Sequence, residues 1–491
     1  MTDLAFMPTR ALAEKIRAGE ISSTDAVNAY LERIQRLNGP INAVVALDET
    51  AARERARVAD EKRANGEPCG PLHGVPLTLK DTWEVVGMPT TAGAPALAQH
   101  RPEKHADIAQ KLVDAGAIII GKTNVPLYAS DLQSYNKVYG VTRNPRDLER
   151  TPGGSSGGAA AAVAAGLTSF EVGSDVGGSI RTPTHFNGVF GHKPTRDLVS
   201  MRGHIPGPPG LVLQPDLVEA GPIARTADDL SFILGIIAGP RTADARAWKL
   251  DLTPARLDSL KDLKVAVWFE DPACPIDNPL QQGYQALSDA LAREGARVQE
   301  ARHELLRLEQ ILPTYFNLLG SLMGTGLTPA QRRQMAWIAR LEKWLRLFIQ
   351  MTLGIGQYGR GVNQRFHEWV VHHETREQMR AQIETLFAEV DVLLTPITPT
   401  VAIHHDHSMP IFNRKISVNG EKRSYMDQFC WIGLATLLGL PATTAPVGKD
   451  ENGLPFGVQI IGAPGMDLTT IRVAQLLEEA GLSGFERPEG F

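Results

Sequence analysis

The sequence predicts an α/β protein with a mixed, mostly parallel central sheet that helices cover on both faces. From residue 75 onward, short apolar runs alternate with helix-forming runs, as expected when strands and helices follow one another. These runs are apolar throughout, which is typical of strands buried on both faces. Of the 491 residues, 43% are hydrophobic and 21% are charged, so the chain can build a large core. We expect a single domain over residues 1–491.

The N-terminal region, residues 1–65, is expected to be helical. Ser22, Ser23 and Thr24 are good N-cap residues, and apolar side chains follow them at helical spacing. In the next region, residues 66–240, strands and helices are expected to alternate from residue 75 onward. The predicted elements of both regions are a charged helix over 46–64, a strand over 75–79, a helix over 106–115, a strand over 117–120, a helix over 159–165 and a strand over 168–172.

Residues 241–425 have a different composition. They are rich in helix formers and aromatic residues, and they lack the glycine-rich loops of the preceding region. We interpret them as a variable segment on the substrate side of the core. Residues 426–491 return to the sheet, with a strand over 456–461 and a helix over 467–480.

Charge and cysteine content limit the classes of function. The formal net charge is −5, which argues against a nucleic-acid partner bound through a basic surface. Three scattered cysteines do not form a disulfide framework and favour a reducing cytoplasm. The N-terminus does not resemble a signal peptide, and no run approaches the roughly 18 apolar residues of a membrane span, so we expect no stable membrane insertion.

Residues 116–123 match the phosphate-loop pattern GxxxxGK[ST], which would indicate a nucleotide site. A phosphate loop needs flexible backbone between its glycines so that successive N–H groups can surround a phosphate. The residues between Gly116 and Gly121 are Ala-Ile-Ile-Ile, which favour a strand, and Gly116 is expected to follow the end of a helix. We therefore predict a strand here.

Residues 153–157 contain G-x-S-x-G, the nucleophile elbow of α/β-hydrolases, with Ser155 at its centre. An elbow directly follows a strand, whereas a polar loop over 143–152 precedes this one. Histidines follow later in the chain, so an elbow-type esterase stays open as an alternative. His404, His405 and His407 flank Asp406, but no further ligand spacing supports a metal centre, and we expect a solvent-exposed turn there and at His372-His373.

A lysine and two glycine–serine loops form a further candidate site. Lys80 ends the apolar strand over 75–79, and Ser155 and Ser156 lie in a glycine-rich loop that opens a helix of very small residues. Ser179 lies in a second such loop over 173–181. Glycines let backbone N–H groups approach a ligand closely, and large side chains are absent where a substrate carbonyl would need room.

These residues resemble the amidase signature family. The matching segments are Lys80, Gly153-Gly154-Ser155-Ser156-Gly157-Gly158 and Asp175-Val176-Gly177-Gly178-Ser179-Ile180-Arg181, and Ser155 lies 75 residues after Lys80 and 24 before Ser179. The resemblance covers roughly residues 65–240 and 430–480, which makes 66–240 the expected catalytic core. It implies the amidase signature fold and an amidohydrolase that cleaves the C–N bond of a linear, small-molecule amide, with no metal or organic cofactor.

The resemblance implies a Ser-cisSer-Lys triad. Ser179 is then the nucleophile that carries the acyl group, Ser155 relays its proton, and Lys80 is the final base, with a cis peptide bond before Ser155. An ordinary lysine is neutral in only about one molecule in 2,500 at pH 7, so Lys80 must be buried or lie near positive charge. The remaining implied residues are Val176, Gly177, Gly178 and Ser179 for the oxyanion hole, Asp175 and Arg181 for support of that loop, and Tyr128, Ala129, Ser130, Leu132 and Gly154 for substrate binding.

An amphipathic helix is predicted over residues 336–351. Its apolar face can pack in the core, form a lid over an apolar pocket, or lie on a membrane surface. We lean to a hydrophobic substrate, such as an anilide or a medium-chain acyl amide, and esters and carbamates could share the acylation chemistry. The residues of this face are Trp337, Leu341, Trp344, Leu345 and Phe348.

A second function stays open, because the A-type glutaminase subunit of tRNA-dependent amidotransferases uses the same scaffold. Residues 196–198 and 206–210 differ from the pattern associated with that subunit, and the net negative charge gives no sign of tRNA binding. The sequence leaves the oligomeric state open, with a homodimer as one option.

Overall fold

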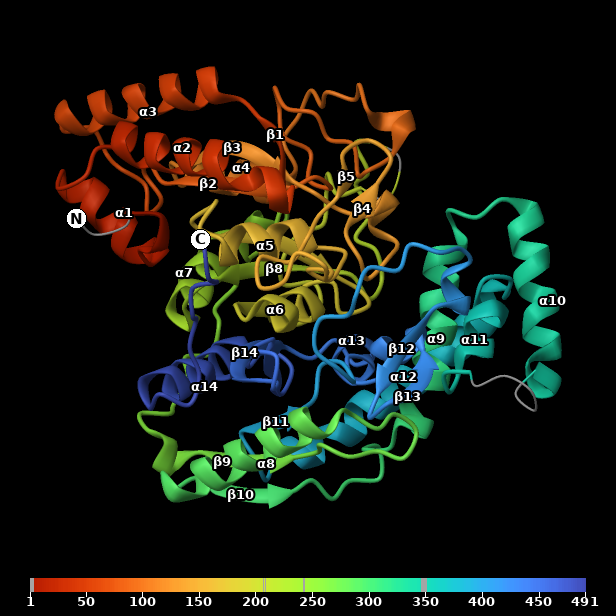
Figure 1. Cartoon of the computed structure of the whole chain (residues 1–491). Helices are drawn as coiled ribbons and strands as arrows, with labels where there is room; N and C mark the ends of the chain where they lie inside the picture. Colours follow the sequence, from red (N-terminus) through yellow and green to blue (C-terminus); the bar gives the residue numbers. More distant parts are fainter. Residues whose placement is uncertain (1–3, 206, 208, 242, 346–350) are drawn as a thin grey trace.

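A mixed sheet of eight strands lies at the centre of the molecule (Figure 1). The computed structural model describes residues 4–205, 207, 209–241, 243–345 and 351–491. The strands lie in the spatial order β10 (Arg297–Glu300), β9 (Lys264–Val267), β11 (Val392–Thr395), β15 (Pro455–Ile461), β14 (Ala442–Lys449), β7 (Phe190–Lys193), β8 (Glu219–Ala224) and β6 (Glu171–Asp175).

The prediction of an α/β protein with a mixed sheet is confirmed, but the prediction that the sheet is mostly parallel is wrong. Within the described residues of this eight-stranded sheet, only β10 with β9 and β9 with β11 pair in parallel. The other five neighbouring pairs are antiparallel. Strands buried on both faces look equally apolar in either direction, so the sequence pattern could not distinguish them. The short connection between β14 and β15 permits only an antiparallel pair.

A second, three-stranded sheet lies beside the central one, in the order β1 (Val44–Leu47), β3 (Ile118–Thr123) and β2 (Pro76–Lys80). β2 and β3 are parallel, and β1 is antiparallel to β3. The phosphate-loop pattern falls on β3 itself, and Gly116 before it has a φ of +90°. This confirms the predicted strand, and it excludes the loop that a phosphate would need.

Helices α2 (Ser23–Ile41) and α3 (Glu49–Ala64) pack on this small sheet (Figure 1). Helices α1 (Thr9–Ala18) and α4 (Asp107–Asp114) pack against α7 (Ala227–Ile237). Ser22 caps α2 as expected, because its side chain accepts a hydrogen bond from the Asp25 N–H. The predicted helix over 46–64 is shorter than expected, because residues 44–47 form β1. β-Branched Val44 and Val45 favour a strand, and Asp48 caps the helix that follows.

Two short helices, α5 (Gly157–Ala164) and α6 (Arg181–Asn187), begin at the two glycine–serine loops. Every residue of both helices is buried. A Cβ atom at Gly158 would lie 2.5 Å from the backbone N of Asn124, so only glycine allows α5 to approach this closely. Helices α7 (Ala227–Ile237), α8 (Asn278–Arg293) and α14 (Asp467–Glu479) pack on the central sheet.

A helix-rich lobe lies at one side of the molecule, with α10 outermost (Figure 1). Trp337 on α10 is 63% exposed, so it is not part of the core. The side chains of Trp344 and Leu345, and all of Phe348, lie outside what the structure describes. Among the described residues, no helix combines the length and apolarity that a membrane span requires. The lobe and the short elements near it are α9 (Leu308–Gly324), α10 (Pro329–Leu345), α11 (Ile355–Gly361), α12 (Phe366–Phe387), α13 (Gly433–Leu437), β12 (Lys415–Val418), β13 (Glu421–Ser424), β4 (Tyr135–Asn136) and β5 (Gly140–Val141).

Candidate active site

The Lys80 ammonium lies among three serine hydroxyls. Its Nζ atom is 2.8 Å from Ser155 Oγ, 2.8 Å from Ser156 Oγ and 2.9 Å from Ser174 Oγ. Lys80 comes from the end of β2, Ser155 and Ser156 from the loop before α5, and Ser174 from β6. Three separate segments therefore converge on one nitrogen atom.

Burial weakens the affinity of the Lys80 amine for a proton. Its side chain has no exposure to solvent, and this desolvation lowers its pKa from 10.5 to about 7, although nearby Asp175 and Glu171 act in the opposite direction. At neutral pH a large fraction of Lys80 is then uncharged. An uncharged amine has a lone pair and can accept a proton, which an ordinary surface lysine cannot do at this pH.

Glu171 joins the strand of Lys80 to the central sheet. Its carboxyl group accepts hydrogen bonds from the Lys80 N–H at 3.1 Å and from the hydroxyls of Thr78 at 2.7 Å and Thr123 at 2.8 Å. Burial raises the pKa of Glu171 to about 8 in spite of these bonds. The end of β2 is thereby held against β6, which places Lys80 beside Ser174.

Ser179 lies on the second glycine–serine loop and is 5% exposed. The Ser156 N–H donates to the Ser179 carbonyl oxygen at 3.1 Å, so the two serine loops lie directly against each other. The peptide bond between Gly154 and Ser155 is cis. Lys80, Ser155 and Ser179 therefore belong to one buried cluster of adjoining segments.

The four N–H groups expected to form an oxyanion hole are not equivalent. The Gly178 N–H donates to Asp175 Oδ1 at 2.9 Å and is already occupied. Within the described part of the chain, the N–H groups of Val176, Gly177 and Ser179 have no such acceptor. These three remain available for a developing negative charge.

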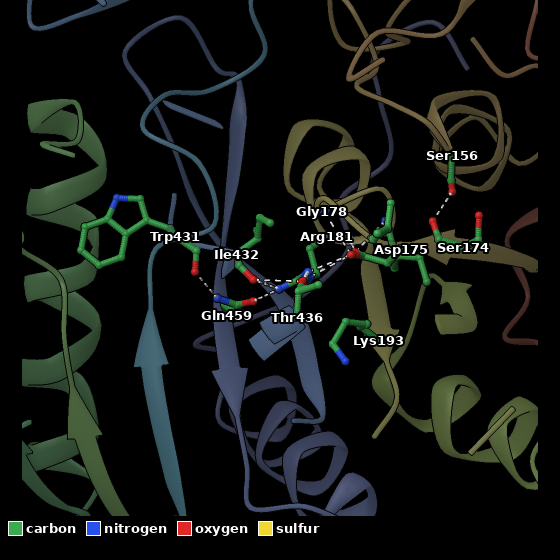
Figure 2. A network of polar contacts seen from close by, with 12 residues as sticks. Ser156, Ser174, Asp175, Gly178, Arg181, Lys193, Trp431, Ile432, Thr436 and Gln459 are labelled. Atoms are coloured by element: carbon green, nitrogen blue, oxygen red, sulfur yellow. Dashed lines mark hydrogen bonds and ion pairs between the residues drawn. The ribbon is translucent and has the colours of Figure 1, made fainter. Parts of the chain in front are cut away.

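Asp175 and Arg181 hold this loop in place (Figure 2). The guanidinium Nη2 of Arg181 lies 2.7 Å from Asp175 Oδ1, and both side chains are fully buried. Arg181 also donates to the Ile432 carbonyl at 2.9 Å and to Gln459 Oε1 at 2.6 Å. The Arg181 charge holds the pKa of Asp175 down to about 2, although burial acts to raise it. The loop is thus joined to β15 and to the segment before α13.

Arg181→Met is expected to destabilise the protein by about 3–5 kcal/mol, because it leaves the buried Asp175 carboxylate without its partner. Chemical denaturation at pH 7 measures this. Lys15→Met is the control, since Lys15 and Glu20 form an exposed pair and their loss should cost less than about 1 kcal/mol. Equal losses in the two variants would contradict a supporting role for Arg181.

Gly154 and Leu132 lie side by side. A Cβ atom at Gly154 would lie 2.7 Å from the carbonyl carbon of Leu132 and from the backbone N of Gln133. Leu132 is 2% exposed. Tyr128 and Ser130 are exposed and Ala129 is half-buried, on a turn whose Tyr128 N–H donates to the Ala92 carbonyl at 2.7 Å. The structure shows no contact between these three residues and the triad.

Gly154→Ala is expected to lower stability by about 1–3 kcal/mol, because the added methyl group meets backbone atoms that cannot move aside as a side chain could. The same substitution at Gly235, an exposed position within α7 with open space around it, should stabilise by about 0.5–1 kcal/mol. Thermal and urea unfolding of both variants test this. An unchanged unfolding midpoint for Gly154→Ala would contradict the close contact.

Sequence reasoning did not assign roles to several residues that contact the site. Ser174 bonds Lys80, and His204 bonds Ser174 with Nε2 and Oγ 2.9 Å apart. Tyr315 donates to the Val176 carbonyl at 3.0 Å, and the half-buried Phe429 ring lies where a Gly177 side chain would point. Ser174 directly precedes Asp175 in the second loop motif, which was a usable signal, whereas the other three come from distant segments and had none.

Two other sequence patterns have ordinary explanations in the fold. The loop before Ser155 is not a strand, so the residues of G-x-S-x-G do not form a nucleophile elbow. The expected exposed turn at 404–407 is only partly right: His404 is exposed, but His407 is half-buried and stacks on Tyr135 with ring centroids 3.8 Å apart. Across the described ranges, no group of three or more His, Cys, Asp or Glu side chains could hold a metal ion.

The chain matches a known protein family over most of its length. The family model described as Amidase matches residues 25–471. The chain therefore belongs to the amidase signature family, and the fold and the class of hydrolase implied by its sequence motifs are confirmed.

Three relatives show the range of this family. The chain is 32% identical over 506 residues to the A-type subunit of glutamyl-tRNA(Gln) amidotransferase from Chloroflexus aggregans, covering 100% of this chain and 99% of the relative. It is 33% identical over 494 residues to fatty-acid amide hydrolase 2-B of Danio rerio, covering 96% and 88%. The solved structure of 6-aminohexanoate cyclic dimer hydrolase is similar with a TM-score of 0.78 and 26% identity, covering 100% and 99%.

Proposed function

We propose that this protein hydrolyses the C–N bond of a hydrophobic carboxamide through an acyl-enzyme on Ser179. The observation that carries the proposal is the fully buried Lys80 amine, with a pKa lowered to about 7 and Ser155 Oγ 2.8 Å away. A buried amine that is partly neutral near pH 7 has a suitable pKa for a general base. Esters and carbamates can react by the same steps.

The reaction begins with a proton transfer. Neutral Lys80 accepts a proton from Ser155, Ser155 accepts one from Ser179, and Ser179 Oγ attacks the amide carbonyl. The N–H groups of Val176, Gly177 and Ser179 stabilise the negative oxygen that forms. The proton then returns through Ser155 to the leaving nitrogen, and water later releases the acyl group by the same route.

An apolar side chain at the oxyanion loop supports a hydrophobic substrate. Phe429 is half-buried beside Gly177, and the buried Phe316 ring lies behind it with centroids 6.4 Å apart. An aryl or medium-chain acyl group would bury apolar surface against Phe429 when bound. The helix-rich segment over 241–425 provides Phe316, which agrees with a substrate-side role for that segment.

A substrate panel tests this proposal. Wild-type protein is assayed with p-nitroacetanilide, p-nitrobutyranilide, butyramide, p-nitrophenyl butyrate and an aryl carbamate. We expect turnover of the anilides, with kcat/KM increasing from acetyl to butyryl, and covalent labelling of Ser179 by a fluorophosphonate detected by peptide mass spectrometry. No hydrolysis of any amide, or labelling at Ser155 instead, would contradict the proposal.

The pH profile gives a further expected result. Because only neutral Lys80 can accept the proton, kcat/KM should rise about tenfold per pH unit below pH 7 and level off above it. An ordinary lysine would instead extend this rise to about pH 10. Stopped or continuous anilide assays between pH 5 and 10 measure the profile, and a rise that continues to pH 10 would exclude the lowered pKa.

A second candidate is the A-type glutaminase subunit of a tRNA-dependent amidotransferase. The 32% identity over the whole length of a relative with this name favours it. Glutaminase activity that appears only with co-purifying subunits would support this function, whereas anilide hydrolysis by the isolated chain would oppose it.

A further inference from the structure

Lys80 has more hydroxyl neighbours than a simple relay requires. As an ammonium group it has three N–H donors, and it has three hydroxyl oxygens within 2.8–2.9 Å to receive them. As a neutral amine it has two N–H donors and one lone pair. One hydroxyl must then reverse its direction and donate to Lys80, and catalysis depends on which one does so.

The surroundings of the three hydroxyls differ. Ser174 Oγ lies 2.9 Å from His204 Nε2, and Ser156 Oγ has a longer contact of 3.4 Å to the Ser174 carbonyl oxygen (Figure 2 shows the latter). Within the described part of the chain, Ser155 Oγ has Lys80 as its only hydrogen-bond partner. Ser174 and Ser156 thus have other acceptors for their hydrogen atoms, and Ser155 does not.

When Lys80 is charged, the direction of the hydrogen bond between Ser174 and His204 is fixed. An ammonium group offers no acceptor, so the Ser174 hydrogen can only go to His204 Nε2. His204 stays neutral, because burial and the neighbouring Lys80 charge lower its pKa well below the usual value. Its ring packs edge-on against Trp83 with centroids 4.4 Å apart, and a β-bridge joins the backbones of these two residues. These contacts hold the His204 ring beside Trp83, which lies three residues after Lys80 in the chain.

We propose that His204 is a positioning residue which, by accepting the Ser174 hydrogen at Nε2, keeps Ser174 an acceptor toward Lys80 and leaves the Lys80 lone pair to Ser155. This inference rests on the proposed function, because it explains how the relay selects the correct hydroxyl. The proton that leaves Ser155 bonds to Lys80 Nζ, and Ser155 regains one from Ser179, so the proton count balances. Without His204, the Ser174 hydroxyl can turn and compete for the lone pair.

A double-mutant cycle with His204→Phe and Ser174→Ala tests the proposal. Phenylalanine keeps the ring against Trp83 but removes the acceptor, so kcat/KM for p-nitrobutyranilide should fall about 5- to 10-fold, the rate equivalent of one hydrogen bond between neutral groups. In the Ser174→Ala background, His204→Phe should change kcat/KM less than about twofold, because the hydroxyl that His204 restrains is absent. His204→Gln, whose Oε1 can accept the same hydrogen, should recover activity to within about threefold of wild type.

The controls separate this proposal from a packing role and from the proposed function. His73 is 5% exposed like His204, and its Nε2 bonds the Ala59 carbonyl, so His73→Phe reports the general effect of losing a buried histidine. If His204→Phe lowered kcat/KM equally in the wild-type and the Ser174→Ala backgrounds, the inference would be overturned. Wild-type protein that turns over no substrate and does not label at Ser179 would instead overturn the proposed function.

A measurement on wild-type protein avoids the risk that a variant does not fold. The ¹⁵N chemical shifts of labelled histidines distinguish a protonated from an unprotonated Nε2 atom, and His204→Gln assigns the signal. We expect unprotonated Nε2 and protonated Nδ1 in His204 at pH 6, where Lys80 is mostly charged. Protonated Nε2 would overturn the inference whatever the activity of the protein.

Discussion

Ser179→Ala is expected to reduce kcat for an anilide by about 10⁴- to 10⁶-fold, because the oxygen that forms the acyl-enzyme is absent. The Ser179 side chain is small, so stability should change by less than about 1 kcal/mol. Steady-state assays, fluorophosphonate labelling and thermal unfolding measure these effects. Ser231→Ala, at a half-buried serine on α7, is the control and should keep wild-type activity.

Comparison with Ser155→Ala shows which of the two serines is the nucleophile. Removing the relay leaves the nucleophile in place, so slow acylation by reactive esters should persist and Ser179 should still label with the fluorophosphonate. Substantial anilide turnover by Ser179→Ala, together with loss of all labelling in Ser155→Ala, would identify Ser155 as the nucleophile and contradict the assignment.

Lys80→Met is expected to abolish amide turnover, with a loss of at least about 10³-fold, while the protein still folds. Methionine has similar length but cannot accept a proton. Lys122→Met is the matched control: Lys122 is equally buried on the neighbouring strand β3, and its ammonium donates to the Trp83 carbonyl and to Thr90. Folded Lys122→Met protein should keep kcat within about tenfold of wild type. Equal inactivation of both variants would indicate a structural cause.

Two opposing contributions determine how Lys80→Met changes the free energy of unfolding. Lowering the pKa from 10.5 to about 7 costs folding roughly 4 kcal/mol at neutral pH, and methionine removes this cost. It also removes three hydrogen bonds, each worth about 1 kcal/mol, so the net change should be less than about 2 kcal/mol. The unfolded chain binds the Lys80 proton more tightly than the folded protein does. Wild type should therefore gain stability relative to Lys80→Met as the pH rises from 7 to 10.5, as urea unfolding at several pH values can show.

The arrangement of the site depends on several elements at once. Lys80 ends a strand of the small sheet, while Ser174 lies near the end of strand β6 in the central sheet, and the Glu171 carboxyl group links the two strands. A displacement of either sheet would separate the amine from its serines. This explains why so much buried polar structure surrounds the site, because each buried polar group needs a partner and so specifies one arrangement.

Local sequence was sufficient for many of the elements. The apolar runs at 117–120 and 456–461 predicted β3 and β15 to within a few residues, and the small residues after Gly157 predicted α5. The strand β1 was missed because four residues next to a charged helix carry too weak a pattern. Strand direction was also missed, since it depends on where the chain crosses the sheet and not on the composition of a strand.

What the sequence determined by itself is the chemistry available: Lys80, Ser155 and Ser179 at characteristic separations, set in loops where glycine allows close backbone approach. What only the tertiary structure decided is the state of those groups. The pKa of Lys80 depends on how completely distant segments exclude water from it, and the direction of its hydrogen bonds depends on His204, which is 124 residues away in the chain. Desolvation and hydrogen-bond geometry arise from atoms brought together by folding, so no local stretch of sequence carries a signal for them.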